Sequence, residues 1–532
     1  MSTQTTHVSG LSVVAGRDVR GGGGTFRAVA AATGAPLEPA FGQLTLEELR
    51  VATDAAADAF AVYRATTPTE RAAFLEAVAE EIEDEADVIV PRAVLESGLP
   101  EVRLRGELGR TTGQLRLFAF VTRQGDHLGA RLDPALPERQ PLPRPDLRQR
   151  MVPLGPVAVF GSSNFPLAFS TSGGDTASAL AAGCPVVVKG HAAHPGTGEL
   201  VARAVTRAVE RCGLPAGVFS FVLGKGTEIG QALVADPRIK AVGFTGSRSG
   251  GMALVHTAAQ RPEPIPVYAE MSSINPVVLL PGALETRDVE VLAEAFVGSL
   301  TLGAGQFCTN PGLVFVPVGA RGDEFVAAAG RRVAASTGQL MLTPGIADAF
   351  DAGVRALEEA GIERVAVGAA GEGPGRPAPV LSAAPAPEGA AVDEVFGSSS
   401  VVVRYSDVNE LVSRIAGLEG QLTATVHYDP SDRDAARALL PVLEDRVGRI
   451  LFNGWPTGVE VGHAMVHGGP FPATSAPSTT SVGSLAIERF QRPVCYQDVP
   501  DELLPEAVRD ENPWALTRRV DGTLVAPRTD AP

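Results

Sequence analysis

Apolar residues recur at helical spacing through the first part of the chain. They lie three or four residues apart over residues 45–97 and again over residues 101–123, which predicts a succession of amphipathic helices. Thr67 and Glu70 have the spacing of a capping box, in which each side chain accepts a hydrogen bond from the backbone N–H of the other residue. Residues 136–150 contain too many prolines for a helix or a central strand, so we expect an extended connector there.

A different pattern begins at Val152, where short apolar runs alternate with helix-length segments. The first runs are VPLGPVAVFG, CPVVVKG, FSFVLG and KAVGFTGS, with helices predicted at 175–182, 196–212 and 228–236. A second unit begins near Ile274, with NPVVLL, LVFVPV, SSVVVRY and LTATVHY as strands and a helix at 289–302. This alternation indicates βαβ units and a doubly wound parallel sheet. We expect the tail from about Arg492 to form an edge strand or an arm that packs on a partner.

Composition and charge exclude several classes of protein. The 532 residues carry a formal net charge of −16, so the chain has no surplus of basic residues with which to bind a nucleic acid or an anionic membrane. The four cysteines include no CxxC pair, which argues against a disulfide framework and a zinc site, and we expect no bound metal. Neither a secretory leader nor a run of about 18 apolar residues is evident, so we expect a soluble protein in the reducing cytoplasm.

Two residues could carry nucleophilic chemistry. Cys308, in TLGAGQFCTNPG, follows a predicted helix and is flanked by glycines that would let a substrate approach its sulfur, although a cysteine taken alone is more often inert. Cys184, by contrast, lies in an apolar run where a buried structural thiol is expected. Glu270, in IPVYAEMSSINPVV, ends a strand and could act as a general base, although a solvated acid is the commoner case. A thiol and a carboxylate from adjacent loops are what thioester formation and hydrolysis require.

Three further segments could bind a cofactor or an oxyanion. Lysine is scarce in this chain, and Lys189 ends the strand PVVVK, from which its ammonium could reach a ribose or a phosphate or could simply be exposed. In FTGSRSGG a strand ends at Phe244 in a glycine-rich turn whose N–H groups suit a pyrophosphate, although such a turn alone is weak evidence. Asn164, in VFGSSNFPLAFS, could donate to an oxyanion or could only cap the following helix.

Taken together, these segments resemble the aldehyde dehydrogenase superfamily, in the order typical of that family and over residues 45–491. NFP matches its oxyanion motif at Asn164, VVVKG its cofactor lysine at Lys189, and FTGS its pyrophosphate turn. YAEMSSINP matches its general-base motif at Glu270, GQFC its nucleophile at Cys308, and EVFG its ribose-contacting segment. The resemblance implies an α/β fold with a doubly wound parallel-sheet cofactor domain, an α/β catalytic domain and a small sheet-extending oligomerisation arm. It also implies a homodimer or homotetramer that acts on a small-molecule aldehyde.

The resemblance further implies a dinucleotide site, with NADP as the expected cofactor and NAD as the alternative. At the position of Ala192, family members that prefer NAD often carry a glutamate, whose charge would repel the 2′-phosphate of NADP. Because this chain has alanine there, NADP could bind. Lys225 is a weaker candidate for that phosphate, because an exposed loop lysine is the simpler interpretation. The expected cofactor-binding residues are Lys189, Ala192, Lys225, Gly230, Phe244, Thr245, Gly246, Ser247, Glu394 and Phe396.

Departures from the family pattern indicate a branch within it. After Glu270 the usual Leu-Gly-Gly-Lys is replaced by Met-Ser-Ser-Ile, and Cys308 is followed by TNPG. Together with FNGWPTGVEVGHAMVHGGPFPATS, these features are similar to the branch that contains α-ketoglutaric semialdehyde (2,5-dioxopentanoate) dehydrogenases, which would convert that aldehyde to 2-oxoglutarate. The same branch includes relatives that act on medium- or long-chain aldehydes. The chain could also be an enzyme that transfers the acyl group to CoA, against which Glu270 argues, or a non-catalytic member of the fold, against which both Glu270 and Cys308 argue.

A substrate that already carries a carboxylate needs a cation in the entrance tunnel. Pairing with the family pattern places ELGRTTGQLRLF on the helix that lines this tunnel, and we expect Arg110 to bind the distal carboxylate. Gln114, one turn away, and Phe165 complete the expected substrate site. The competing interpretation is that Arg110 pairs with an acid on the same helix, such as Glu107.

The resemblance also divides the chain into five expected segments. They are the helical N-terminal part of the cofactor domain (1–135), a connector and oligomerisation arm (136–151), the dinucleotide-binding domain (152–273), the catalytic domain (274–470), and a C-terminal return with an oligomerisation tail (471–532).

Overall fold

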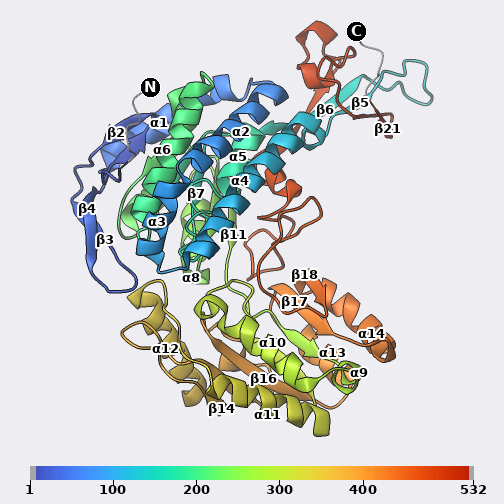
Figure 1. The fold of residues 1–532 in the computed structure, drawn as a ribbon. Coiled ribbons are helices and arrows are strands. Elements are labelled where there is room, and N and C mark those ends of the chain that lie inside the picture. Colours follow the sequence, from blue (N-terminus) through green and yellow to red (C-terminus); the bar gives the residue numbers. More distant parts are fainter. Residues whose placement is uncertain (1–6, 527–532) are drawn as a thin grey trace.

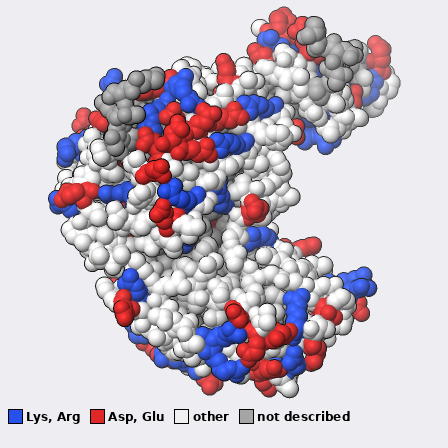
Figure 2. All heavy atoms as spheres, in the orientation of Figure 1, with Lys and Arg blue, Asp and Glu red and all other residues white. Residues whose placement is uncertain are grey.

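The computed structural model describes residues 7–526, which form two α/β lobes and a projecting arm (Figure 1). Each of these parts has its own sheet, with seven strands in either lobe and five in the arm. Figure 2 shows the hollow that separates the two lobes on this face, and acidic side chains gathered over helices α2 (Pro68–Asp84) and α6 (Pro195–Arg211). Within the described residues, no helix is both long enough and apolar enough to cross a membrane.

The sheet of the first lobe has the strand order β11-β10-β7-β8-β9-β1-β2. Strands β7 to β11 are parallel, and alternate side chains of β7 enter different apolar clusters, with Val157 and Val159 in one and Ala158 and Phe160 in the other. Both faces of this sheet are therefore buried, which is why its strands read as continuous apolar runs. The parallel strands are β7 (Val157–Phe160), β8 (Val186–Lys189), β9 (Phe219–Val222), β10 (Ala241–Thr245) and β11 (Val267–Glu270).

Helices surround this sheet close to where the sequence predicts them. The predicted capping box is confirmed, because the N–H of Glu70 lies 3.2 Å from the hydroxyl of Thr67 and the N–H of Thr67 lies 2.8 Å from the Glu70 carboxylate. The helices of the lobe besides α2 and α6 are α1 (Leu46–Tyr63), α3 (Ala86–Ser97), α4 (Glu101–Gln124), α5 (Gly174–Ala182), α7 (Glu228–Ala235) and α8 (Arg248–Ala259).

Four strands before Leu46 are not predicted by the sequence, whose pattern indicates only helices over residues 1–135. Strand β1 pairs with β9 through Val13 and Phe221, so it extends the sheet of the first lobe, while β3 and β4 form a separate ribbon. Strands β2 and β3 are largely exposed, so they lack the apolar run that marks the parallel strands. The four are β1 (Ser12–Val14), β2 (Arg17–Val19), β3 (Thr25–Val29) and β4 (Pro36–Gly42).

The second lobe repeats the parallel α/β pattern, with the strand order β14-β15-β16-β13-β12-β17-β18. All neighbouring strands are parallel except β14, which is antiparallel to β15 at one edge. Its strands are β12 (Val277–Leu279), β13 (Leu313–Pro317), β14 (Glu363–Val367), β15 (Val380–Ala384), β16 (Ser399–Tyr405), β17 (Gln421–His427) and β18 (Val447–Phe452). Its helices are α9 (Pro281–Thr286), α10 (Val289–Thr301), α11 (Ala320–Ala334), α12 (Pro344–Glu359), α13 (Val408–Ala416) and α14 (Arg433–Glu444).

The arm corrects the expectation for residues 136–150. Its sheet has the order β19-β6-β5-β20-β21, and β6 (Leu147–Pro153) lies inside it, between β19 (Gln491–Gln497) and β5 (Arg131–Asp133). The prolines are confined to the loop that joins β5 to β6, so they do not prevent the last residues of the stretch from entering an interior strand. The prediction of an edge strand near Arg492 is confirmed by β19. The opposite edge is β21 (Thr523–Val525), which pairs with the interior strand β20 (Arg518–Val520).

The carboxyl ends of the parallel strands of the first lobe lie on the same side of the sheet. Several of the candidate residues are at these strand ends. In register, Lys189 at the end of β8 pairs with Phe160 at the end of β7, and Thr245 at the end of β10 pairs with Glu270 at the end of β11. Ligands of open parallel sheets bind outside the carboxyl ends of the strands. The fold therefore brings the predicted cofactor lysine and the predicted base to the same side of the lobe.

Candidate functional site

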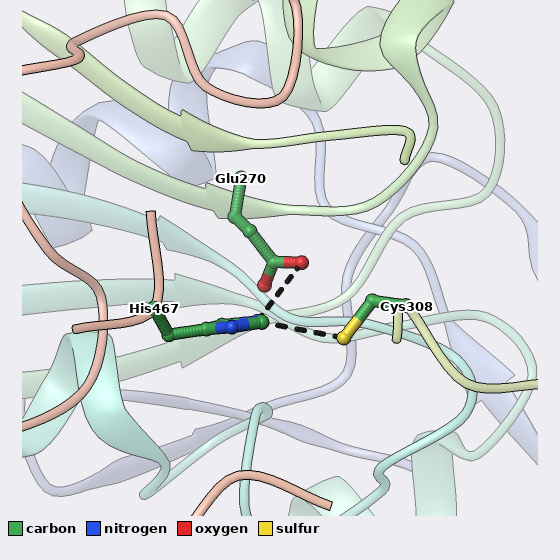
Figure 3. Close-up of side chains that lie close together, drawn as sticks. All are labelled: Glu270, Cys308 and His467. Carbon is green, nitrogen blue, oxygen red and sulfur yellow. Dashed lines mark hydrogen bonds and ion pairs between the residues drawn. The ribbon is translucent and has the colours of Figure 1, made fainter. Parts of the chain in front are cut away.

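Three side chains from distant segments of the chain meet in one cluster (Figure 3). The Sγ atom of Cys308 lies 3.4 Å from Nε2 of His467, and the same Nε2 lies 3.3 Å from Oε1 of Glu270. The carboxylate and the imidazole are almost completely buried. The structure thus brings together the two residues that the sequence singles out for nucleophilic chemistry, and it adds a histidine between them.

Local backbone structure explains how each of these residues reaches the cluster. Glu270 is the last residue of β11, and Cys308 follows α10 and a short 3₁₀ helix, Leu302–Gly305. Gly303 and Gly305 have φ angles of +56° and +70°, which glycine adopts without strain, so the chain turns sharply before the thiol. His467 lies in the loop that follows β18, and its backbone N–H donates to the hydroxyl of Thr480 at 2.9 Å.

The electrostatic surroundings hold the thiol in its protonated form. Burial and the neighbouring Glu270 carboxylate raise the pKa of Cys308 well above its usual range, while Arg449 acts in the opposite direction. A nucleophilic cysteine reacts as the thiolate, so this thiol needs a group that accepts its proton. His467 is placed for that role, and its Nδ1 atom and Oε2 of Glu270 have no hydrogen-bond partner among the described residues.

His467 is absent from the residues that the sequence singles out. It is separated from Cys308 by 159 positions and lies in a glycine-rich loop, VHGGP, with no spacing that would indicate a catalytic role. The only available signal is that histidine is rare in this chain, with eight in 532 residues. The ligand atoms of Glu270, Cys308 and His467 lie within 4.8 Å of one another, so the same three residues could hold a thiophilic metal ion.

Asn164 and Phe165 lie against the segment that leads to Cys308. The Asn164 amide donates to the carbonyl of Gln306 at 3.0 Å, and the Phe165 ring packs edge-on against Phe307, with centroids 5.6 Å apart. The Asn164 side chain is buried, and its backbone carbonyl accepts a hydrogen bond from Arg103 at 2.9 Å. Both residues are therefore held next to the thiol-bearing loop, as expected from the sequence.

A cavity of about 440 Å³ lies at the carboxyl edge of the first sheet. Ser247 caps α8 by accepting a hydrogen bond from the N–H of Gly250, so the positive end of this helix lies at the cavity wall. Burial lowers the pKa of Lys189, and no ion pair joins its ammonium to a carboxylate within residues 7–526. This arrangement leaves a free cation and a helix N-terminus for the phosphates of a dinucleotide. Six expected cofactor residues line the cavity: Lys189, Gly230, Phe244, Thr245, Gly246 and Ser247.

The other four expected cofactor residues lie outside this wall. Ala192 follows His191, which does line the cavity, and exposed Lys225 precedes Gly226, which lines it as well. Glu394 and Phe396 line a much smaller cavity with Phe307 and Ser273, closer to the thiol. Burial raises the pKa of Glu394 to about 7.

A third cavity, of about 780 Å³, lies between α4 and the loop after β18. Arg110 and Arg449 line it, together with Thr457, whose carbonyl accepts a hydrogen bond from Thr309, the residue after Cys308. The cavity therefore lies near Cys308, although the thiol itself is not part of its wall.

Gln114 lies on the same helix as Arg110 but is buried against Gly174, away from the cavity wall. Glu107 accepts hydrogen bonds from the N–H groups of Leu167 at 2.9 Å and Ala168 at 3.0 Å, and the structure shows no ion pair between it and Arg110. Arg110 and Glu107 thus form no direct ion pair, although the Glu107 charge opposes the lowering of the Arg110 pKa that burial causes.

The chain is similar to known sequences over nearly its whole length. A profile of the aldehyde dehydrogenase family matches residues 20–470. The chain is 55% identical over 521 residues to α-ketoglutaric semialdehyde dehydrogenase 2 of Azospirillum brasilense, with 97% of this chain and 99% of the relative covered. It is 48% identical over 526 residues to α-ketoglutaric semialdehyde dehydrogenase of Acinetobacter baylyi, with the same coverage.

Solved structures show the same fold at lower sequence identity. A mutant aldehyde dehydrogenase C from Pseudomonas syringae, in complex with NAD⁺ and octanal, superposes with a TM-score of 0.79 at 21% identity and covers 94% of this chain and 98% of its own. An aldehyde dehydrogenase of Bacillus cereus in complex with NAD⁺ has a TM-score of 0.78 at 22% identity, covering 92% and 96%. The predicted α/β fold is thereby confirmed.

Proposed function

Because the chain belongs to the aldehyde dehydrogenase family, we propose that it oxidises 2,5-dioxopentanoate to 2-oxoglutarate with NADP, through a thioester on Cys308. The aldehyde oxidation itself follows from the family. The named substrate is supported by the two relatives with 55% and 48% identity over nearly the full chain and by the arginine-lined cavity beside the thiol. The observation that carries the mechanism is the Cys308–His467–Glu270 cluster.

The first step is activation of the thiol. His467 Nε2 accepts the proton of Cys308, and the thiolate attacks the aldehyde carbon to form a tetrahedral adduct with a negatively charged oxygen. The Asn164 amide and the backbone N–H of Cys308 stabilise this oxygen, and one such donor typically contributes about 3 kcal/mol to lowering the barrier. In the structure one N–H of the Asn164 amide donates to the Gln306 carbonyl, and its second N–H is the donor proposed for the adduct.

The cavity at the edge of the first sheet fits a dinucleotide. A dinucleotide held there by Lys189 and the turn before α8 would supply the hydride acceptor that converts the adduct on Cys308 to a thioester. Lys189 supplies a cation without a carboxylate partner in the described part of the chain, and Ala192 presents no negative charge to a 2′-phosphate. These two features support NADP over NAD.

The second half of the reaction is hydrolysis of the thioester. Glu270 accepts a proton from a water molecule, which attacks the acyl carbon and releases the carboxylic acid and the Cys308 thiolate. The unpartnered Oε2 atom of Glu270 is free to bind this water. Transfer of the acyl group to water needs a base at this position, whereas transfer of the acyl group to CoA would not need one.

The five-stranded sheet of the arm supports the further proposal of a homodimer or homotetramer. Its outer strands β19 and β21 leave backbone groups free at both edges. Leu142 and Leu524 on the arm are 69% and 63% exposed, so association would bury apolar surface. Light scattering of the purified protein tests this, and a monomer at all concentrations would contradict it.

Steady-state formation of NADPH and NADH tests the proposed reaction. We expect 2,5-dioxopentanoate with NADP to give a higher kcat/KM than succinate semialdehyde, hexanal or decanal. Cys308→Ala is the control and should abolish turnover. A preference for decanal would leave the fold and the cysteine chemistry in place but would show that the natural substrate is a fatty aldehyde.

A further inference from the structure

The cavity beside the thiol contains two arginines without acidic partners. Arg110 lies on α4 and Arg449 on β18, and neither forms an ion pair with any carboxylate in the described residues. Both guanidinium groups belong to partly buried side chains, and burial lowers the pKa of each. The charges of Glu107, Glu460 and Glu270 oppose this effect at Arg110, whereas no carboxylate in the described part of the chain does so at Arg449. An anion in the cavity would therefore stabilise the charge of Arg449.

A single loop holds the two side chains together. Arg449 Nη1 donates to the carbonyl of Gly458 at 3.3 Å, and Arg110 Nη2 donates to the carbonyl of the next residue, Val459, at 3.0 Å. These acceptors belong to consecutive residues, so one short loop segment contacts both guanidinium groups. The Arg110 guanidinium also lies 4.8 Å from the ring centroid of Phe169, which fixes its plane.

Three of the other guanidinium nitrogens of these two arginines are buried and lack a hydrogen-bond partner among the described residues. Nη1 of Arg110 and both Nε and Nη2 of Arg449 have no hydrogen-bond partner among residues 7–526. The Nε and Nη2 atoms of an arginine form the edge that binds a carboxylate with two parallel hydrogen bonds, whereas a single nitrogen binds one oxygen. The acid on the cavity wall, Glu460, is exposed and accepts a hydrogen bond from the adjacent N–H of Val461 at 2.9 Å.

We propose that Arg449 binds the carboxylate of the substrate through its Nε and Nη2 atoms, and that Arg110 binds the neighbouring 2-oxo oxygen through Nη1. This inference rests on the proposed function and refines it. Binding of the distal carboxylate, which the sequence analysis assigns to Arg110, is assigned here to Arg449. The site would then recognise the 2-oxo acid end of the substrate, which carries three acceptor oxygens, and would distinguish it from a simple carboxylate. Arg449 is a specificity-determining residue in this assignment.

The test uses anions that resemble the substrate but lack the aldehyde. Hexanal oxidation serves as the reporter reaction, and 2-oxopentanoate and pentanoate serve as competitive inhibitors. In the unchanged enzyme, 2-oxopentanoate should bind more tightly than pentanoate. Arg449→Met should raise the inhibition constants of both anions by roughly ten-fold or more, as expected for loss of a charge-assisted bidentate contact.

Two further variants separate the roles and control for folding. Arg110→Met should raise the inhibition constant of 2-oxopentanoate more than that of pentanoate, so that the preference for the 2-oxo acid is lost. Arg449→Lys keeps the charge without the planar edge and should give an intermediate loss for both anions. Arg437→Met, on the exposed surface of α14 in the same lobe, should leave both constants unchanged.

The outcomes distinguish this inference from the proposed function. If Arg449→Met and Arg449→Lys change the inhibition constants no more than Arg437→Met does, the assignment to Arg449 is overturned, whatever substrate the enzyme prefers. If the anions bind and depend on Arg449 while the unchanged enzyme prefers hexanal to 2,5-dioxopentanoate, the anion site stands and the proposed substrate is wrong.

Discussion

The Nε2 atom of His467 lies 3.4 Å from the sulfur of Cys308, although 159 positions separate them in the chain. Burial and Glu270 raise the pKa of the thiol, so a neighbouring base decides how readily the thiolate forms. The same imidazole nitrogen is also 3.3 Å from a carboxylate oxygen of Glu270. The cluster thus places the proposed nucleophile and the proposed thioester base on either side of one histidine.

Replacement of His467 by phenylalanine should slow the formation of the reactive thiolate. We expect His467→Phe to lower kcat/KM at neutral pH by roughly 100-fold or more, a usual contribution of a general base. The rate at which iodoacetamide alkylates Cys308, followed by mass spectrometry of the Cys308 peptide, should also rise only at higher pH than in the unchanged enzyme. His463→Phe, an exposed position in the same loop, is the matched control. An unchanged pH profile of alkylation would show that His467 takes no part in activating the thiol.

Removal of the Glu270 carboxylate should separate the two halves of the reaction. Glu270→Gln should still form about one equivalent of reduced cofactor per active site in a rapid burst, because attack by the thiol and hydride transfer do not use this carboxylate. Later turnover should be slower by roughly 100-fold or more, because no group then accepts the proton of the attacking water. Stopped-flow measurement of the burst checks this, with Glu263→Gln, an exposed acid, as control. A variant without a burst would place Glu270 before acylation instead.

The sequence predicts the parts of this site that lie at the ends of apolar strands. Lys189 and Glu270 each end a strand of the parallel sheet, so the pattern that predicts the strands also locates these residues. Cys308 stands out through its glycine-rich surroundings and its place in an ordered set of motifs. His467 and Arg449 have no such local mark, because one lies in an irregular loop and the other in the ordinary-looking strand VGRILF. Their roles depend on the packing of the two lobes, which local periodicity does not encode.

In the fold, too, elements marked by a local pattern are predicted, whereas elements that depend on pairing with distant residues are not. The predicted helix over residues 101–123 agrees with α4 to within one residue, because its apolar spacing is sustained over many turns. The sequence analysis places most of β6 in an extended connector because several prolines precede it. No proline lies between Leu147 and Val152, so these residues are able to pair in a sheet. Its pairing with β19, more than three hundred residues away, is what makes it an interior strand.

Lys189 and Lys225 are the two candidates for the lysine that contacts the 2′-phosphate of NADP. Their environments favour Lys189. It lines the cofactor cavity, whereas Lys225 is exposed and lies beside that wall. Lys189→Met should therefore raise the KM for NADP by roughly ten-fold or more, as loss of an ion pair to phosphate would, and Lys225→Met should change it much less. Cofactor titrations measure both effects, and the opposite order would assign the phosphate to Lys225.

A negative charge at position 192 should reverse the cofactor preference. Ala192→Glu places a carboxylate next to the cavity residue His191, where it would repel the 2′-phosphate but not the ribose hydroxyl of NAD. We expect the ratio of kcat/KM for NADP to that for NAD to fall by roughly ten-fold, about 1.4 kcal/mol of discrimination. An unchanged ratio would mean that residue 192 does not face the 2′ position of the bound cofactor.

Glu394 should make the stability of the protein depend on pH near neutrality. Burial raises the pKa of this carboxyl from 4.5 to about 7 in the folded chain, so the folded state binds its proton more tightly than the unfolded state does. The stabilising contribution of the protonated form is complete below pH 4.5 and is lost as the pH rises through about 7. The full difference is on the order of 3 kcal/mol, since each pKa unit corresponds to about 1.4 kcal/mol. Glu394→Gln removes this dependence, so its melting temperature without cofactor should exceed that of the unchanged protein at mildly alkaline pH, and the difference should shrink as the pH is lowered toward 5. Equal shifts at all pH values would show that the carboxyl titrates at its ordinary pKa.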